Sequence, residues 1–255
     1  MTTGLLVAEI RKVTTLKFWW ALLIPPLIVG LFASAIYAGI ADETGDLGDD
    51  FATGIASVGL YFALAWVVLF AGVFGAINAG TEYRHKTLTP TFLTASGRDG
   101  VIAAKLLVTA GFALGYGVIV ELASLICMVA FGGDRLDVNG TLFQAFTVGL
   151  VAVVCWSLIG AGLGLLMASP TGAALMLVAW YVVGELTVSL VASGMGLKGF
   201  GSILPGSATI ATVALGELDG DSGFADWPLA PILMLAWTVA LAGSGWWATR
   251  QRDIT

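Results

Sequence analysis

The sequence predicts an all-α membrane protein with six transmembrane helices, an N-terminal interfacial helix and an outer re-entrant segment between spans five and six. Of the 255 residues, 58% are hydrophobic and 11% are charged, whereas a soluble domain carries about 25% charged residues. Six apolar runs are long enough to cross a bilayer, and the charges between these runs are sorted by sign. Residues 1–255 are therefore predicted to form a single transmembrane domain.

The six predicted spans are apolar runs of about 20 residues or more, the length that an α-helix needs to cross the hydrocarbon core. They lie at roughly 18–40, 52–79, 103–131, 143–168, 172–193 and 229–248. Two pairs of glycines, Gly111 with Gly115 and Gly160 with Gly164, have the spacing that allows helix backbones to approach closely. We expect both pairs to lie at contacts between spans.

The basic residues indicate the direction in which the chain crosses the membrane. With six spans, nine of the eleven Lys and Arg residues fall on one side, and Arg135 and Lys198 fall on the other. Basic residues stay on the cytoplasmic side during insertion, so both termini are predicted to be cytoplasmic. The nine are Arg11, Lys12, Lys17, Arg84, Lys86, Arg98, Lys105, Arg250 and Arg252.

Residues 1–17 differ from the spans because their apolar residues form one stripe at helical spacing. The stripe consists of Leu6, Ile10, Val13 and Leu16, with Arg11, Lys12 and Thr15 opposite. This pattern predicts a helix that lies in the inner membrane interface, with its basic face toward the lipid headgroups. The alternative is a cytoplasmic extension of the first span.

Residues 194–228 form the longest outer segment, and they contain an apolar piece from Ser202 to Leu215. About 14 residues are too few to span the bilayer, so this piece predicts a re-entrant or interfacial helix. A seventh span here would place Arg250 and Arg252 outside, against the positive-inside rule.

Several classes of function are disfavoured. The sequence has no basic patch with interleaved aromatic residues, so we do not expect binding to nucleic acid. The single histidine, His85, and the absence of CxxC or HExxH patterns argue against a metal site and a membrane hydrolase. Cys127 and Cys155 both fall in apolar spans and are expected to be buried free thiols.

The inner segment at 80–100 is the most charged inner part of the chain and is longer than a minimal turn between antiparallel helices. A short helix with Glu82, Arg84, His85 and Lys86 at one end could present polar side chains to a cytoplasmic partner. The alternative is a solvated loop whose bases only fix the topology. Composition does not decide between the two.

This segment carries a family resemblance. Its residues Glu82-Tyr83-Arg84-His85-Lys86-Thr87-Leu88-Thr89-Pro90, followed by Arg98 and by Ala103-Ala104-Lys105-Leu106, resemble the EYRHGT…TP…R…AAKL signature of ABC exporter permeases of the second class. These type V transmembrane subunits belong to bacterial drug, antibiotic and polysaccharide exporters. Lys86 stands where the signature most often has Gly. The interfacial helix, the six spans and the outer segment near Leu204-Pro205 are similar to the family as well.

The resemblance implies that segment 80–100 forms a coupling helix that docks on a separate ATP-binding cassette ATPase subunit in the bacterial cell membrane. Residues implied in this contact are Glu82, Tyr83, Arg84, His85, Lys86, Leu88 and Phe92. A second permease copy, identical or a paralogue, is expected to complete the transporter. The sequence has no phosphate-binding loop, so this chain is expected to bind no cofactor and to be no enzyme, with ATP and Mg on the partner subunit.

Two acidic residues fall within predicted spans, Glu121 in span three and Glu185 in span five. A carboxylate at the bilayer centre costs at least about 2.5–3.5 kcal/mol, so each should face protein or a water-filled cavity. They are candidates for the substrate pathway of an exporter, or for a proton-coupled secondary transporter. The structural alternative is a hydrogen bond between helices. A membrane enzyme or assembly factor is a third class, without supporting motifs.

Overall fold

The computed structural model describes residues 3–41, 53–94, 97–133, 136–197, 199–218, 220 and 223–252. Within these ranges the chain is helical and contains no strand, as the sequence predicts. The two outer bases, Arg135 and Lys198, lie outside the described residues. The side chain of Leu88 lies outside them as well.

Six helices of the described part are long and apolar enough to cross a membrane, in agreement with the predicted spans. They are α2 (Phe18–Gly39), η2 with α3 (Ile55–Arg84), α5 (Arg98–Phe131), α6 (Gly140–Met167), α7 to α8 (Pro170–Gly194) and α10 (Leu229–Gln251). Three shorter α-helices accompany them in the described part: α1 (Thr3–Thr15), α4 (Leu88–Thr94) and α9 (Pro205–Val213). Helices α1 and α9 lie within the predicted segments at 1–17 and 202–215, and their interfacial and re-entrant placement stays a prediction.

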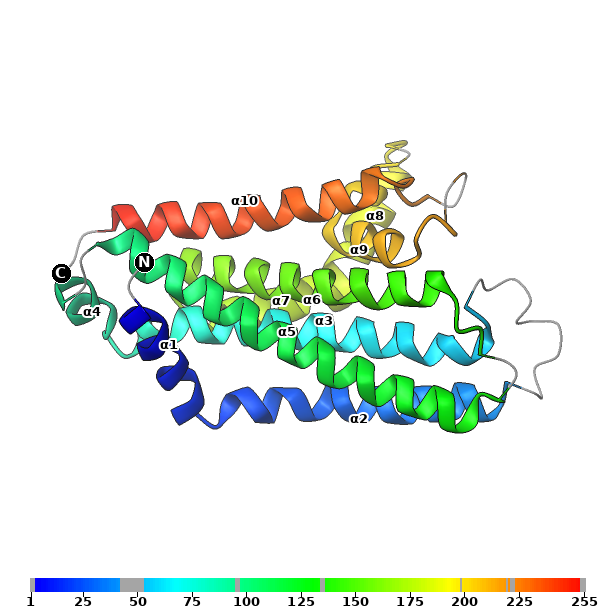
Figure 1. Ribbon diagram of the computed structural model, residues 1–255. Helices are drawn as coiled ribbons and strands as arrows, with labels where there is room; N and C mark the ends of the chain where they lie inside the picture. The colour runs from blue at the N-terminus through cyan, green and yellow to red at the C-terminus, as the bar shows by residue number, and fades with distance from the viewer. Residues whose placement is uncertain are drawn as a thin grey trace.

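The two described ends of the chain lie together at one end of the bundle, beside α1 and α4 (Figure 1). We call this the α4 end, and the opposite end, which carries α9, the α9 end. Helix α3 is the central element, since it packs against α2, α5, α6 and α7. Its large buried residues Leu60, Val67 and Phe74 form much of the main core.

Helices α3 and α6 approach closely because glycines line their contact. A Cβ atom at Gly160 would lie 1.9 Å from the carbonyl oxygen of Gly72, and one at Gly164 would lie 2.5 Å from that of Ala76. The predicted packing role of this glycine pair is confirmed. The prediction for Gly111 and Gly115 is wrong within this chain, because a Cβ atom at either position would meet nothing within 4 Å.

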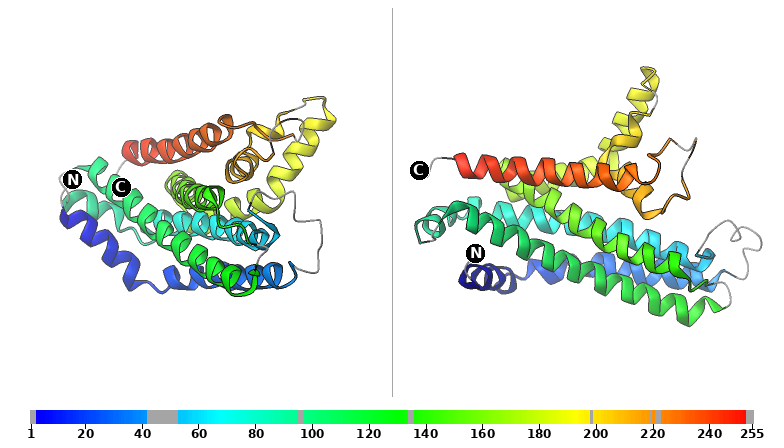
Figure 2. Two further views of the ribbon diagram at one scale, coloured as in Figure 1. Left: turned by 45° about the vertical axis from the view of Figure 1, so that its right-hand side comes forward. Right: turned by 45° about the horizontal axis from the view of Figure 1, so that its top comes forward.

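Span five is not the uniform helix that its apolar run predicts. It consists of α7 (Pro170–Ala179), a π-helical turn η4 (Trp180–Gly184) and α8 (Glu185–Gly194). Almost none of its residues is buried, and α8 leans away from the rest of the bundle (Figure 2). π-Helical turns interrupt the regular hydrogen-bond ladder and occur often at functional sites, which directs attention to this span.

We predict that Gly160→Ala lowers the melting temperature in detergent clearly, because the added methyl group must push α3 and α6 apart. Overpacking of this kind costs about 1–3 kcal/mol. The control is Gly243→Ala on α10, where a Cβ atom would meet nothing within 4 Å. Equal melting temperatures for both variants would show that α3 and α6 are less tightly packed at Gly160 than the structure indicates.

Candidate coupling surface and substrate cavity

The turn after α3 (Val58–Arg84) positions the segment that sequence analysis singled out. The predicted short helix begins later than expected: Glu82 and Arg84 belong to the last turn of α3, and α4 starts at Leu88. The N–H of Thr87 donates to the carbonyl of Glu82 at 3.0 Å, and the N–H of Lys86 donates to that of Tyr83 at 3.2 Å. This pattern is a Schellman motif, which ends a helix and reverses the chain.

Lys86 occupies the position of that motif that requires a left-handed backbone, and its φ is 54°. A residue with a Cβ atom is disfavoured there by about 1–2 kcal/mol, and glycine is not. This explains physically why the signature that the segment resembles has glycine at this position. The turn forms with lysine, and its ammonium group is exposed.

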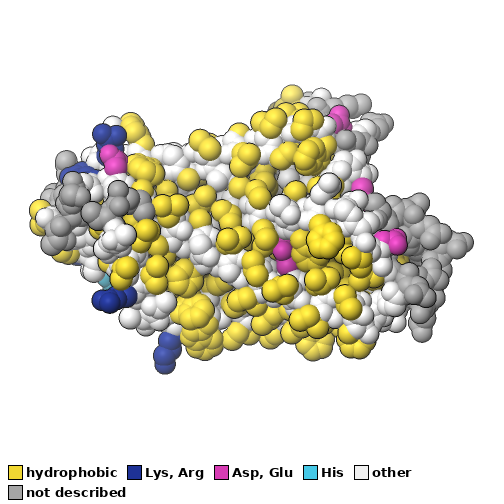
Figure 3. Space-filling view, in the orientation of Figure 1, with side chains coloured by type: hydrophobic (Ala, Val, Ile, Leu, Met, Phe, Trp, Pro, Cys, Tyr) yellow, Lys and Arg dark blue, Asp and Glu magenta, His cyan; other side chains and the backbone are white. Residues whose placement is uncertain are grey.

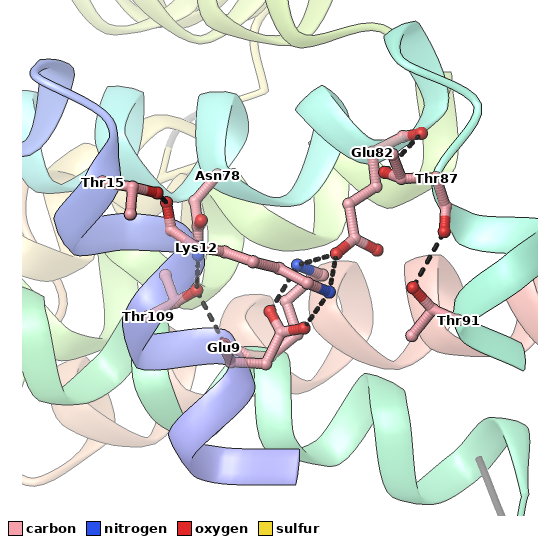
Figure 4. A network of polar contacts seen from close by, with 9 residues as sticks. Glu9, Lys12, Thr15, Asn78, Glu82, Thr87, Thr91 and Thr109 are labelled. Carbon is pink, nitrogen blue, oxygen red and sulfur yellow. Dashed lines mark hydrogen bonds and ion pairs between the residues drawn. The ribbon is translucent and has the colours of Figure 1, made fainter. Parts of the chain in front are cut away.

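Four charged side chains meet directly beside this turn. The Nζ atom of Lys12 lies 2.5 Å from Oε1 of Glu9 and 2.6 Å from Oε1 of Glu82. The Nζ atom of Lys105 lies 2.7 Å from Oε2 of Glu9 and 3.1 Å from the same Glu82 oxygen. We call these four residues the ion cluster; they come from α1, α3 and α5 (Figure 4).

The ion cluster is electrically neutral and mostly shielded from solvent. Glu9 and Lys105 are each 2% exposed and Glu82 is 5% exposed, whereas Lys12 is half-buried. Burial lowers the pKa of Lys12, but the hydrogen bonds and charges of Glu82 and Glu9 outweigh it and raise this pKa above its usual value. Each buried ion faces an opposite charge, as a buried salt bridge requires.

Two aromatic residues expected at the partner contact instead pack against the bundle. Phe92 is 9% exposed and lies 5.6 Å beneath the guanidinium of Arg98. The Tyr83 ring lies 5.0 Å from the guanidinium of Arg252, and its hydroxyl is 2.7 Å from that of Thr249. Both rings therefore fasten the coupling segment to its own chain.

The two arginines above these rings hold the C-terminal part of α10 in place. Arg98 donates to the carbonyls of Arg250 and Arg252 at 2.8 and 3.0 Å. Arg252 in turn donates to the last carbonyls of α6, those of Leu165 and Leu166. Cations at a helix C-terminus satisfy unpaired carbonyls and complement the helix dipole.

Among the exposed residues of this segment are three consecutive polar residues and one large apolar residue. Arg84, His85 and Lys86 are exposed, and Leu93 on α4 is 76% exposed. We call these four the coupling surface. On the face shown in Figure 3, Lys and Arg side chains gather at the α4 end, while hydrophobic side chains cover the middle.

A cavity of about 800 Å³ lies between α3, span five and α9, toward the α9 end. Tyr61, Ala65, Tyr181, Glu185 and Ser207 are among its lining residues. The carboxylate of Glu185 accepts hydrogen bonds from the N–H groups of Gly206 and Ser207 at 2.7 and 2.5 Å, and from the Ser207 hydroxyl at 2.9 Å. It thus caps the N-terminus of α9, where a negative charge is favourable.

Glu121 lies inside the bundle and is not among the residues that line this cavity. It is 3% exposed, and its Oε1 atom accepts no hydrogen bond within the described residues. Gly149 on α6 leaves room for it, since a Cβ atom there would lie 2.6 Å from that oxygen. A pathway role for Glu121 stays a prediction, and the structure does not bring it together with Glu185.

Sequence reasoning missed Glu9 as a site residue and treated Lys105 only as a topology marker and a signature residue. A signal was available for Glu9, because it is a charge on the apolar flank of α1 that needs a partner when buried. Leu93 gave no signal, since its exposure depends on which face of α4 contacts the bundle.

Six apolar helices around a packed core define a polytopic α-helical membrane protein. A family model described as an ABC-2 family transporter protein matches residues 5–185, which is more than half of the chain. The chain therefore belongs to this family and is an ABC-2 type permease, as its resemblance in segment 80–100 predicts. No curated protein matches the chain.

We predict that Lys105→Met strongly destabilises the protein, because it leaves the carboxylates of Glu9 and Glu82 buried with only Lys12 between them. Removing one partner of a buried ion pair costs about 3–5 kcal/mol. The measurement is thermal unfolding of the purified chain in detergent.

The matched control is Lys86→Met, which removes an exposed base from the same end of the molecule. Adding Glu82→Gln to Lys105→Met should restore part of the lost stability, since it removes the buried carboxylate charge that has lost its Lys105 partner. If Lys105→Met and Lys86→Met unfold at the same temperature, the ion cluster does not carry the stability assigned to it.

Proposed function

We propose that this permease is the membrane subunit of an ATP-driven exporter and docks a separate ATP-binding cassette ATPase through its coupling surface. The family supports transport, and the geometry of segment 80–100 supports the docking site. Exposed Arg84, His85 and Lys86 supply charge, and Leu93 supplies an apolar knob on a helix at the α4 end. The run of three consecutive exposed polar residues at the turn between α3 and α4, Arg84, His85 and Lys86, is the observation that carries the proposal, since such side chains can pair with complementary groups of a partner.

In this proposal the ion cluster transmits force from the docking site. Glu82 lies at the last turn of α3, two residues before exposed Arg84, and its carboxylate binds lysines on both α1 and α5. A push on the turn therefore acts on three helices together. Glu82, Tyr83 and Phe92 contribute as internal anchors of the coupling segment, and Leu88 remains a predicted contact.

The same proposal places the protein in a bacterial cell membrane with the α4 end in the cytoplasm. Nine of the eleven Lys and Arg residues support this orientation under the positive-inside rule. Helix α1 would lie in the inner interface, since Val13 is buried against the bundle while Arg11 and Lys17 are exposed. ATP and Mg would bind to the partner subunit.

The cavity beside span five is proposed as this chain's half of the substrate pathway. Span five, which borders the cavity, is largely unburied, so a second permease copy facing this span would close the pathway. Its lining combines aromatic and aliphatic residues with the carboxylate of Glu185, which suits amphipathic cargo. Cyclic symmetry of such a pair would place both cavities at one interface.

The proton-coupled alternative receives less support from these sites. Glu185 is held by three hydrogen-bond donors of α9, and Glu121 is enclosed by the bundle without a neighbouring carboxylate partner in the described part. Neither arrangement connects the two acids into a relay. The family match favours ATP as the energy source.

We predict that Leu93→Asp, and separately the pair Arg84→Glu and Lys86→Glu, reduces co-purification of the ATPase by on the order of tenfold or more, since like charges and a buried acid oppose docking. The permease is tagged, extracted in mild detergent, and the bound ATPase is quantified by mass spectrometry.

The control is Lys17→Glu, which reverses an exposed base of the same end that lies outside the coupling surface. All variants should unfold at the wild-type temperature, because the changed side chains are exposed. Undiminished ATPase recovery with Leu93→Asp would refute the docking site.

We predict that Glu185→Gln reduces ATP-dependent export, because the carboxamide loses charge opposite the N-terminus of α9 and loosens one wall of the cavity. Replacing a helix cap costs about 1 kcal/mol, so the subunit should still fold. Export is followed in proteoliposomes with the amphipathic dye that the wild-type complex transports best. Glu121→Gln serves as the comparison, and export unchanged in both would remove these acids from the pathway.

A further inference from the structure

A second hollow lies between α1, α2 and α5. It measures about 600 Å³, within the range of about 300–1,000 Å³ that is typical of small-molecule sites. We call it the α1 groove, since α1 borders it at the α4 end. Its walls include Leu6 and Ile10 of α1, Trp19 and Leu23 of α2, and Gly111 and Gly115 of α5.

The two glycines make this surface hollow. A Cβ atom at Gly111 or Gly115 would meet nothing within 4 Å, so no side chain of the described chain fills the space above them. Tyr116 and Trp19 form the bottom of the groove, where the Tyr116 hydroxyl donates a hydrogen bond to the Trp19 carbonyl. The lining of the α1 groove is mainly apolar, with the Trp19 indole and the Tyr116 hydroxyl as its polar groups.

Two exposed bases belong to the chain segments that border the groove at the α4 end. Arg11 follows the lining residue Ile10, and Lys17 precedes the lining residue Trp19 by two positions. The ion cluster engages Lys12 but neither of these two. An apolar groove whose bordering segments carry two exposed bases suits a molecule with a hydrocarbon tail and an anionic head.

We propose that the α1 groove binds one acyl chain of an anionic phospholipid of the inner leaflet, and that Arg11 and Lys17 hold its headgroup. This inference rests on the cytoplasmic placement of α1 in the proposed function and does not involve the ATPase. Each base near an anionic headgroup contributes about 1 kcal/mol, which is about fivefold in affinity.

The GxxxG spacing of Gly111 and Gly115 also suits a transmembrane helix of a second permease copy, but α1 argues against that occupant. A membrane-crossing helix is about 10 Å wide and must continue past the interface, where Leu6 and Ile10 border the groove. An acyl chain ends at the interface, where the two bases stand. The lipid therefore fits the boundary that α1 sets.

The experiment is native mass spectrometry of the purified full chain without any ATPase, after exchange into detergent containing phosphatidylglycerol or phosphatidylcholine with the same acyl chains. We expect wild-type protein to retain phosphatidylglycerol at least about fivefold better. Gly111→Leu should abolish this retention by filling the groove. The matched control, Gly243→Leu, places the same side chain at an exposed glycine of α10 with nothing within 4 Å and should retain lipid normally.

The headgroup is tested separately with the pair Arg11→Gln and Lys17→Gln, which should remove the preference for phosphatidylglycerol. The control pair, Lys86→Gln and Arg250→Gln, neutralises two exposed bases elsewhere at the α4 end. Since Arg11 and Lys17 are exposed, this arm remains decisive even if Leu at position 111 impairs folding.

Two results would overturn the proposal. Equal retention of both lipids, insensitive to Arg11 and Lys17, would reduce it to unspecific lipid contact. A shift from dimer to monomer in Gly111→Leu with lipid retention unchanged would assign the α1 groove to a second copy. Neither result depends on ATPase docking, so failure here is distinct from failure of the proposed coupling surface.

Discussion

The ion cluster is the constraint on which the α4 end of the molecule depends. Three of its four charges are almost fully buried, and a buried ion is tolerated only where an opposite charge compensates it. The carboxylates of Glu9 and Glu82 therefore fix how α1, α3 and α5 sit relative to one another. Both the coupling surface and the α1 groove use that arrangement, since each borders a helix that the cluster holds.

Within segment 80–100, some side chains pack against the chain's own bundle, and others are exposed where a partner could bind. Tyr83 and Phe92 each lie against an arginine and the bundle, so their aromatic faces are used internally. The left-handed turn at Lys86 then reverses the chain and places Leu93 on the outside. This division gives a rigid base beneath a small exposed surface, which is what the transfer of a mechanical push requires.

Much of this architecture could be predicted from the sequence, because hydropathy and charge act along the chain. The six spans, α1 and α9 follow from run length and periodicity. The direction of individual side chains could not be predicted, since it depends on packing between segments distant in sequence. Phe92 and Leu93 are adjacent and both apolar, yet contacts with α5 bury the first and leave the second exposed. Likewise, Gly111 and Gly160 share one motif but only Gly160 meets a neighbouring helix.

Communication between the coupling surface and the cavity requires an element that reaches both, and α3 does so. Its last turn carries Glu82, while Tyr61 and Ala65 near its start line the cavity. A helix of 27 residues is about 40 Å long, and the tight glycine contact with α6 resists bending. The Tyr181 hydroxyl donates to the Ala65 carbonyl at 2.7 Å and so connects span five to α3. Four residues later in span five, the Glu185 carboxylate accepts a hydrogen bond from the N-terminus of α9. In the proposed function, a displacement of α3 at the ion cluster would thus move the cavity wall directly. Span five would bend at its π-helical turn to follow this movement.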